Sequence, residues 1–137
     1  MAGIFELEVA TPDRQLLRER VHEARVPGAN GELGILPGHA ALLSALGNGP
    51  LVYTPEGGPP RCMAICGGLL EVLPDHVRVL ASRAEFSDEI DRKRAEAALQ
   101  RASERLEKPT PELDVARAIN AMRRAQARLE AAKIGGK

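Results

Sequence analysis

The chain has 137 residues, of which 44% are apolar and only 2% are aromatic. Its 19 Lys and Arg residues balance its 19 Asp and Glu residues, so the formal net charge is zero. This balance argues against recruitment of nucleic acid or anionic lipid by an overall basic field, and the scarcity of aromatics removes base-stacking platforms. No apolar run approaches the roughly 20 residues that span a bilayer, so we expect any membrane association to be indirect.

Residues 1–86 predict a β domain, because alternating or apolar runs are separated by turn residues. Residues 5–9 alternate between apolar and acidic side chains and predict the first strand. The run over 14–28 is ambiguous between helix and strand, and the Pro27-Gly28 turn at its end favours a strand. Many short strands broken by Pro and Gly, as at Gly67-Gly68, are typical of an antiparallel sandwich or closed barrel.

Residues 87–137 predict a helical hairpin. Ser87 or Asp88 is expected to cap the first helix, and Thr110 with Pro111 to begin the second. Apolar side chains then recur at helical spacing. They are Ile90, Ala95, Ala98, Leu99, Ala102 and Leu106 in the first helix. The stripe of the second helix is Val115, Ile119, Met122, Gln126 and Leu129. Alanine buries little area, so the hairpin should dock weakly on the β domain, as a two-state arm would.

No catalytic or metal site can be assembled from the sequence. His22, His39 and His76 fall on separate predicted elements, and there is no phosphate-binding loop of the GxxxxGK[ST] type, no GxGxxG and no GxSxG. Cys62 and Cys66 are four residues apart, the wrong spacing for a redox or zinc pair. We therefore expect two buried, reduced cysteines and a chain that is not an enzyme.

The second predicted helix carries a local excess of positive charge. Residues 112–137 hold six basic and three acidic side chains, a net of +3. Arg117, Arg124 and Arg128 fall on one helical stripe, which we expect to lie opposite the apolar stripe. This pattern fits a solvated face, or a surface for an acidic partner or for phosphates.

Residues 31–46, GELGILPGHAALLSAL, form the most distinctive stretch. Taken alone they predict an apolar strand, a Pro-Gly turn and then a small apolar helix or loop. Together with VATPDR at 9–14 and GGLLEVLPDHVRVLASRAE at 67–85, they make the whole chain resemble the epsilon subunits of bacterial F-type ATP synthases.

The resemblance implies an α+β fold, with a ten-stranded antiparallel β sandwich over 1–86 followed by a two-helix hairpin over 87–137. It implies that the sandwich binds the gamma subunit and the ring of c subunits at the foot of the central stalk. The hairpin would fold on the sandwich in one state, and extend toward the catalytic α and β subunits and inhibit ATP hydrolysis in another. The partner-binding residues would be Gly38 and His39 in the sandwich, and Arg117, Arg124 and Arg128 in the hairpin.

Some members of this family carry an ATP-binding motif, I/L-D-x-x-R-A, at the start of the first helix. It stands here as residues 90–95, and the resemblance implies ATP as a regulatory ligand with no cofactor required. The implied ATP-binding residues are Glu85, Ile90, Asp91, Arg94, Ala95, Arg124 and Arg128. Arginine forks suit phosphate oxygens. Glu85 and Asp91 would instead serve the adenine and ribose side, or orient the arginines.

Three rival interpretations remain at the level of sequence. A small enzyme with an unrecognised site lacks any nucleophile placed beside a base. A stand-alone module that binds nucleic acid through the hairpin conflicts with the zero net charge. The absence of a transit peptide favours a bacterium over a mitochondrial or plastid homologue, although a mature or plastid-encoded chain would also lack one. We expect a peripheral protein on the cytoplasmic face of a bacterial plasma membrane.

Overall fold

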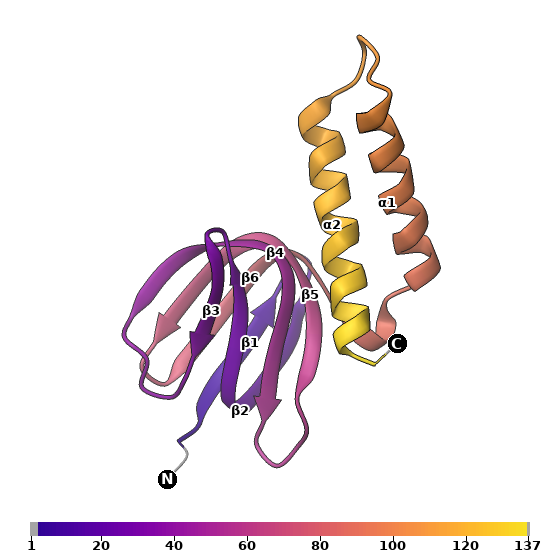
Figure 1. Cartoon of the computed structure of the whole chain (residues 1–137). Coiled ribbons are helices and arrows are strands. Elements are labelled where there is room, and N and C mark those ends of the chain that lie inside the picture. Colours follow the sequence, from indigo (N-terminus) through magenta and orange to yellow (C-terminus); the bar gives the residue numbers. More distant parts are fainter. Residues whose placement is uncertain (1–2, 137) are drawn as a thin grey trace.

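The computed structural model describes residues 3–136, and in this range six strands form one closed, barrel-like sandwich (Figure 1). The strands are β1 (Phe5–Ala10), β2 (Gln15–Gly28), β3 (Gly31–Ile35), β4 (Leu42–Pro55), β5 (Arg61–Leu73) and β6 (His76–Phe86). Their order is β1-β6-β5-β4-β2-β3, and an additional pairing between β1 and β2 closes the sheet.

The α+β class is confirmed, but the predicted ten strands are six over residues 3–136, and β1 pairs with β6 in parallel rather than antiparallel. The difference arises because Pro and Gly positions that were expected to end strands bend them instead. β4 continues through Gly47 and Pro50, and pairing with β5 runs from Leu42 to Tyr53. The segment after the Pro-Gly turn, predicted as a small helix or loop, is the beginning of β4.

One of these bends lies at Gly67-Gly68, inside β5. Gly68 has φ +121, and a Cβ atom there would lie 2.1 Å from the carbonyl oxygen of Leu80 on β6. Only glycine tolerates both the positive φ and the close approach of the two backbones. This bend lets one long strand curve around the sandwich, where two separate strands were expected.

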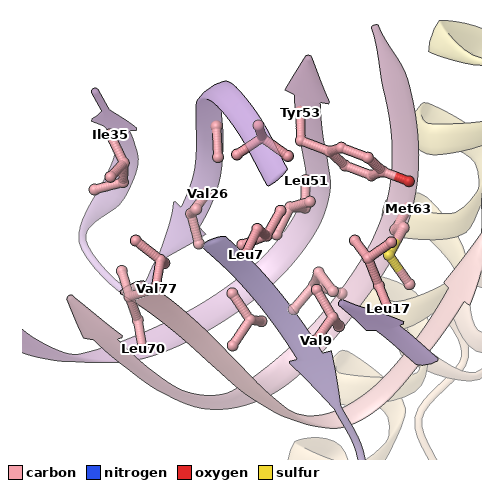
Figure 2. Packing of buried hydrophobic residues seen from close by; sticks show 14 of the residues in the cluster. Leu7, Val9, Leu17, Val26, Ile35, Leu51, Tyr53, Met63, Leu70 and Val77 are labelled. Atoms are coloured by element: carbon pink, nitrogen blue, oxygen red, sulfur yellow. The ribbon is translucent and has the colours of Figure 1, made fainter. Parts of the chain in front are cut away.

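The core lies inside the closed sheet and is built from aliphatic side chains, as the scarcity of aromatics requires. Along β1, Phe5, Leu7 and Val9 are buried, and they alternate with half-buried residues. Figure 2 shows Leu7 and Val9 converging with side chains from the other five strands, among them Leu51 and Met63. This large apolar cluster makes the sandwich the stable platform for the rest of the chain.

The hairpin consists of a 3-10 turn, η1 (Ser87–Glu89), and two helices, α1 (Arg92–Glu107) and α2 (Val115–Ile134). α2 packs against β4 and β5, and α1 packs on α2, so α2 lies between the sandwich and α1 (Figure 1). The predicted start of the sandwich at residue 1 and the predicted end of the hairpin at residue 137 lie outside the described residues. Within residues 3–136, no helix is long and apolar enough to cross a membrane.

The helix starts differ from those predicted. Asp91 caps α1 by accepting a hydrogen bond from the backbone N–H of Arg94 at 3.0 Å, and Asp114 caps α2 through that of Arg117 at 3.0 Å. The predicted caps at Ser87 or Asp88 and at Thr110 are therefore wrong. Asp91 and Asp114 both have an extended backbone, so each helix begins just after its aspartate, whose short side chain reaches the N–H three residues on.

The buried face of α2 also differs from the predicted stripe. Val115 is 51% exposed, and Ile119, Met122 and Leu129 are only half-buried. The buried positions of α2 are all alanines: Ala118, Ala125, Ala127, Ala131 and Ala132. Small side chains face inward because α2 is covered on two sides and must approach both the sheet and α1 closely.

We expect Gly68→Ala to lower the free energy of unfolding by about 3 kcal/mol or more, because it adds backbone strain and a steric clash at the β5–β6 bend. Gly34→Ala on β3 is the matched control, since its Cβ would meet nothing within 4 Å and its φ is not positive. It should change stability by about 1 kcal/mol at most. Urea unfolding of both variants checks this, and equal stabilities would contradict the assigned bend.

Candidate functional site: an arginine groove in the hairpin

A groove of about 500 Å³ runs between α1 and α2 and is floored by β5 and β6. Its walls combine small and basic side chains. The lining residues are Ala64, Cys66, Arg83, Ala84, Glu85, Arg94, Ala98, Arg101, Ala102, Arg105, Ala121, Arg124, Ala125 and Arg128. The alanines leave the space and the arginines supply the charge.

Helical periodicity brings these arginines together. Arg94, Arg101 and Arg105 follow one stripe of α1, at intervals of seven and four residues, and Arg124 and Arg128 follow the facing stripe of α2. Alanines at the intervening positions keep the two helices close without filling the gap. The groove therefore forms between two helix faces that carry arginine and alanine side chains instead of large apolar ones.

The groove is strongly cationic. Among the described residues that line it, only Glu85 is acidic, and its carboxylate accepts a hydrogen bond from Nε of Arg128. The side chains of Arg128 and Glu85 are 24% and 31% exposed, so this ion pair is partly shielded from solvent. Guanidinium groups bind phosphate oxygens through paired, charge-assisted hydrogen bonds. The geometry suits a ligand that carries several negative charges.

Four of the predicted ATP-binding residues line this groove: Glu85, Arg94, Arg124 and Arg128. The other three, Ile90, Asp91 and Ala95, are not among its lining residues. Ile90 is 4% exposed and packs against the end of α2, Ala95 is fully buried, and the Asp91 side chain caps α1. The motif at 90–95 therefore builds the start of α1 and aims Arg94 into the groove.

The predicted partner-binding residues are divided between two regions. Arg117 lines a neighbouring hollow of about 580 Å³, at the N-terminus of α2, which shares Arg105 and Arg124 with the groove. Gly38 and His39 lie between β3 and β4 and do not line either hollow. There, the N–H of Gly38 donates to the carbonyl oxygen of Pro74 at 3.2 Å, which ties this turn to the β5–β6 connection.

Arg117, Arg124 and Arg128 lie opposite the predicted apolar stripe, but that stripe is not the buried face of α2. Arg117 is exposed, whereas Arg124 and Arg128 are half-buried beside α1, because the buried face of α2 is alanine rather than the predicted apolar stripe. Sequence reasoning also missed Arg83, Arg101 and Arg105. Spacing could have found the last two, since they continue the stripe that begins at Arg94.

Both cysteines are buried and neither forms a disulfide, as predicted. Burial raises the pKa of the Cys62 thiol to about 11, and the Glu130 charge adds to this effect. Burial also raises the pKa of Cys66, although Arg124 and Arg83 oppose the shift. Within residues 3–136, no group of three or more His, Cys, Asp or Glu side chains could hold a metal ion.

Two family models match this chain, one on each side of the boundary between sandwich and hairpin. Residues 4–87 match the family model described as ATP synthase, Delta/Epsilon chain, beta-sandwich domain. Residues 88–133 match the model described as ATP synthase, Delta/Epsilon chain, long alpha-helix domain. The chain belongs to the ATP synthase delta/epsilon chain family. This result confirms the resemblance inferred from the motifs.

Bacterial members of the family are similar in sequence to this chain over nearly its whole length. An ATP synthase epsilon chain of Solibacter usitatus is 53% identical over 132 residues, which cover 96% of this chain and 98% of the relative. One from Bacillus licheniformis is 41% identical over 129 residues, covering 94% and 98%. Family membership makes this chain a subunit of ATP synthase rather than a free-standing enzyme, as the sequence predicted.

Solved structures of ATP synthases contain the same fold. A chain in the Euglena gracilis mitochondrial ATP synthase, in a structure of its OSCP/F1/c-ring, is 26% identical with a TM-score of 0.82, covering 95% of this chain and 81% of that one. A chain in the central stalk and c-ring structure of the Tetrahymena thermophila mitochondrial enzyme is 15% identical, with a TM-score of 0.59 and coverage of 97% and 96%. The second likeness is one of fold.

Proposed function

We propose that this family member works in the central stalk of a bacterial F-type ATP synthase, at the cytoplasmic face of the plasma membrane. In this proposal the sandwich (residues 1–86) binds gamma and the c-ring, and the hairpin (residues 87–137) regulates ATP hydrolysis. The observation that carries it is the match of both family models. It is supported by the fold shared with chains in ATP synthase assemblies that include the c-ring.

Apolar surface on the sandwich supports a role as a docking platform. Five leucines of the sandwich have large exposed fractions: Leu36, Leu43, Leu69, Leu73 and Leu80. Leu69 and Leu80 are paired across β5 and β6, and Leu36 lies two residues before Gly38. Contiguous exposed apolar side chains usually mark a surface that a partner covers. We assign Gly38 and His39 to the same partner-binding end of the sandwich.

The hairpin has the construction expected of a movable arm. Its apolar contact with the sandwich is made by α2 through small side chains, chiefly Ala131 and Ala132 against Cys62 and Ala64, and the Arg128–Glu85 ion pair is its polar contact. Because each alanine buries little apolar area, we infer that α2 can leave the sheet without unfolding the sandwich. The released arm would then extend along gamma and present its arginines to acidic surface on the α and β subunits.

Three arginines of α2, Arg117, Arg124 and Arg128, are proposed to inhibit hydrolysis in the extended state. Changing all three to Ala in the assembled complex should relieve inhibition, and high salt should relieve it in the wild type. Each exposed ionic contact contributes only roughly 0–1 kcal/mol, so we expect the triple variant to act where single changes do little.

Arg123→Ala is the matched control for this test, because Arg123 is exposed on α2 and does not line the groove. Deleting residues 87–137 supplies the fully relieved rate of hydrolysis and should leave the complex assembled and coupled. A triple variant that inhibits as strongly as wild type at low salt would show that these arginines form a solvated face.

We further propose that the arginine groove of the folded hairpin binds one ATP. Five arginines of the two facing helices would surround the phosphates: Arg94, Arg101, Arg105, Arg124 and Arg128. Glu85 would orient Arg128 through their ion pair and contribute to the adenine and ribose side. ATP that binds only the folded arm stabilises the folded arm by mass action. ATP would therefore act as a regulatory ligand, and no phosphoryl transfer is needed.

Calorimetric titration of the isolated protein with ATP tests this site. Arg94→Ala and Arg124→Ala should each weaken binding about ten- to a hundredfold, because a hydrogen bond to a charged group contributes about 1.5–3 kcal/mol. Arg123→Ala should bind ATP like wild type. No heat of binding at millimolar ATP, or unchanged affinity in both groove variants, would exclude the proposed site.

A further inference from the structure

The arginine groove holds more positive charge than its own carboxylate balances. Of the described residues that line it, six are arginines, and Glu85 pairs with one of them, Arg128. Within residues 3–136, the other five form no ion pair: Arg83, Arg94, Arg101, Arg105 and Arg124. Like charges that converge repel one another, so an anion that neutralises several of them at once is bound favourably.

The arginines of the two helices form an extended row rather than a single cluster. Arg94, Arg101 and Arg105 are spread over eleven residues of α1, which rise about 16 Å along the helix axis. Because α2 runs antiparallel to α1, Arg128 and Arg124 follow the same direction on the facing wall (Figure 1). The row reaches the border of the neighbouring hollow, since both hollows are lined by Arg105 and Arg124.

The row has a defined end at the tip of the hairpin. The neighbouring hollow contains two carboxylates, Glu112 and Asp114, beside Arg117. Asp114 is held in place there, since its side chain caps α2. These carboxylates disfavour an anion, so an anionic ligand should extend along the groove only as far as Arg105 and Arg124.

The shape of the groove suits a thin chain that carries charge along its whole length. Between the arginines its walls are alanines, such as Ala98 and Ala121, which leave a narrow space without large side chains. In linear inorganic polyphosphate every unit is negatively charged, whereas the adenosine of ATP is neutral. A triphosphate has only two P–O–P linkages and meets the whole row only if the arginine side chains bend toward it. A longer chain can lie along the row and meet each guanidinium group in turn.

We propose that the arginine groove also binds linear inorganic polyphosphate, in chains longer than a triphosphate that lie along the row of arginines. The inference rests on the proposed role of the groove as a phosphate site and adds a second class of ligand to it. A chain in the groove contacts both helices and Arg83 of β6. It therefore holds the arm folded on the sandwich and competes with ATP for the same arginines.

The experiment is calorimetric titration of the full-length chain with pyrophosphate, tripolyphosphate and longer linear polyphosphates. The affinity per phosphate unit should rise with chain length until the row is covered, and then level off because of the carboxylates at the tip. Polyglutamate of matched charge should bind about tenfold more weakly or worse, because its carboxylates stand on side chains of a bulkier backbone. Equal affinity for polyglutamate, or no heat of binding with any polyphosphate, would overturn the proposal.

Arg105→Ala removes the far end of the row and separates long chains from short ones. It should weaken binding of a long chain roughly three- to tenfold and that of tripolyphosphate less, since the remaining arginines still hold a short chain. Arg123→Ala is the matched control, because Arg123 does not line the groove, and it should bind both like wild type. An equal loss for both lengths would contradict the extended arrangement.

Failure of this inference is distinguishable from failure of the proposed ATP site. If ATP binds and polyphosphate does not, the inference is wrong while the nucleotide site stands. If polyphosphate binds and ATP does not, the nucleotide site is wrong while the inference stands. If both bind, polyphosphate should displace ATP, and simultaneous binding of the two would place polyphosphate outside the groove and overturn the inference.

Discussion

The contact between α2 and the outer surface of β4 and β5 is the constraint on which the behaviour of the hairpin depends. Its apolar part is a small cluster of Cys62, Ala64, Ala131 and Ala132 with Ile90, and the ion pair of Arg128 with Glu85 adds a polar contact, whereas the core of the sandwich contains many large aliphatic side chains. At about 25 cal/mol per Å² of buried apolar surface, alanine and cysteine contribute little each. The chain therefore joins a stable platform to a helix pair held by a small free energy, one that ligands and partners can outweigh.

The arginine groove is a second constraint on α2, because two of its arginines belong to that helix. Arg124 and Arg128 are half-buried between the helices, where they also face the proposed nucleotide. In the proposed function these two guanidinium groups serve either the ATP phosphates or the acidic surface of the catalytic subunits. Since one side chain cannot do both, occupancy of the groove and inhibition by the arm exclude each other. Competition of this kind couples ATP to the arm without a separate transmission path.

Local patterns in the sequence were sufficient for the class of fold and for part of the groove. The change from alternating strands to helical spacing separated sandwich from hairpin, and Arg124 and Arg128 fell on a basic stripe. Arg94 was named only through the motif of the family that the chain resembles. Strand ends were missed because Gly67-Gly68 and Gly47 bend strands that tertiary pairing continues. The alanine face of α2 was missed because close packing against both the sheet and α1 favours small side chains, and a search for large apolar residues overlooks them.

The most direct test of this account is hydrogen exchange of the full-length chain with and without saturating ATP. Without ATP, the amides of α2 should exchange through a low-energy opening, well before those of Leu7 and Val9 in the core, and ATP should slow exchange in α1 and α2 but not in the core strands. If α2 exchanges only together with the core strands, and ATP changes nothing, the hairpin is a fixed part of the sandwich and the account is wrong.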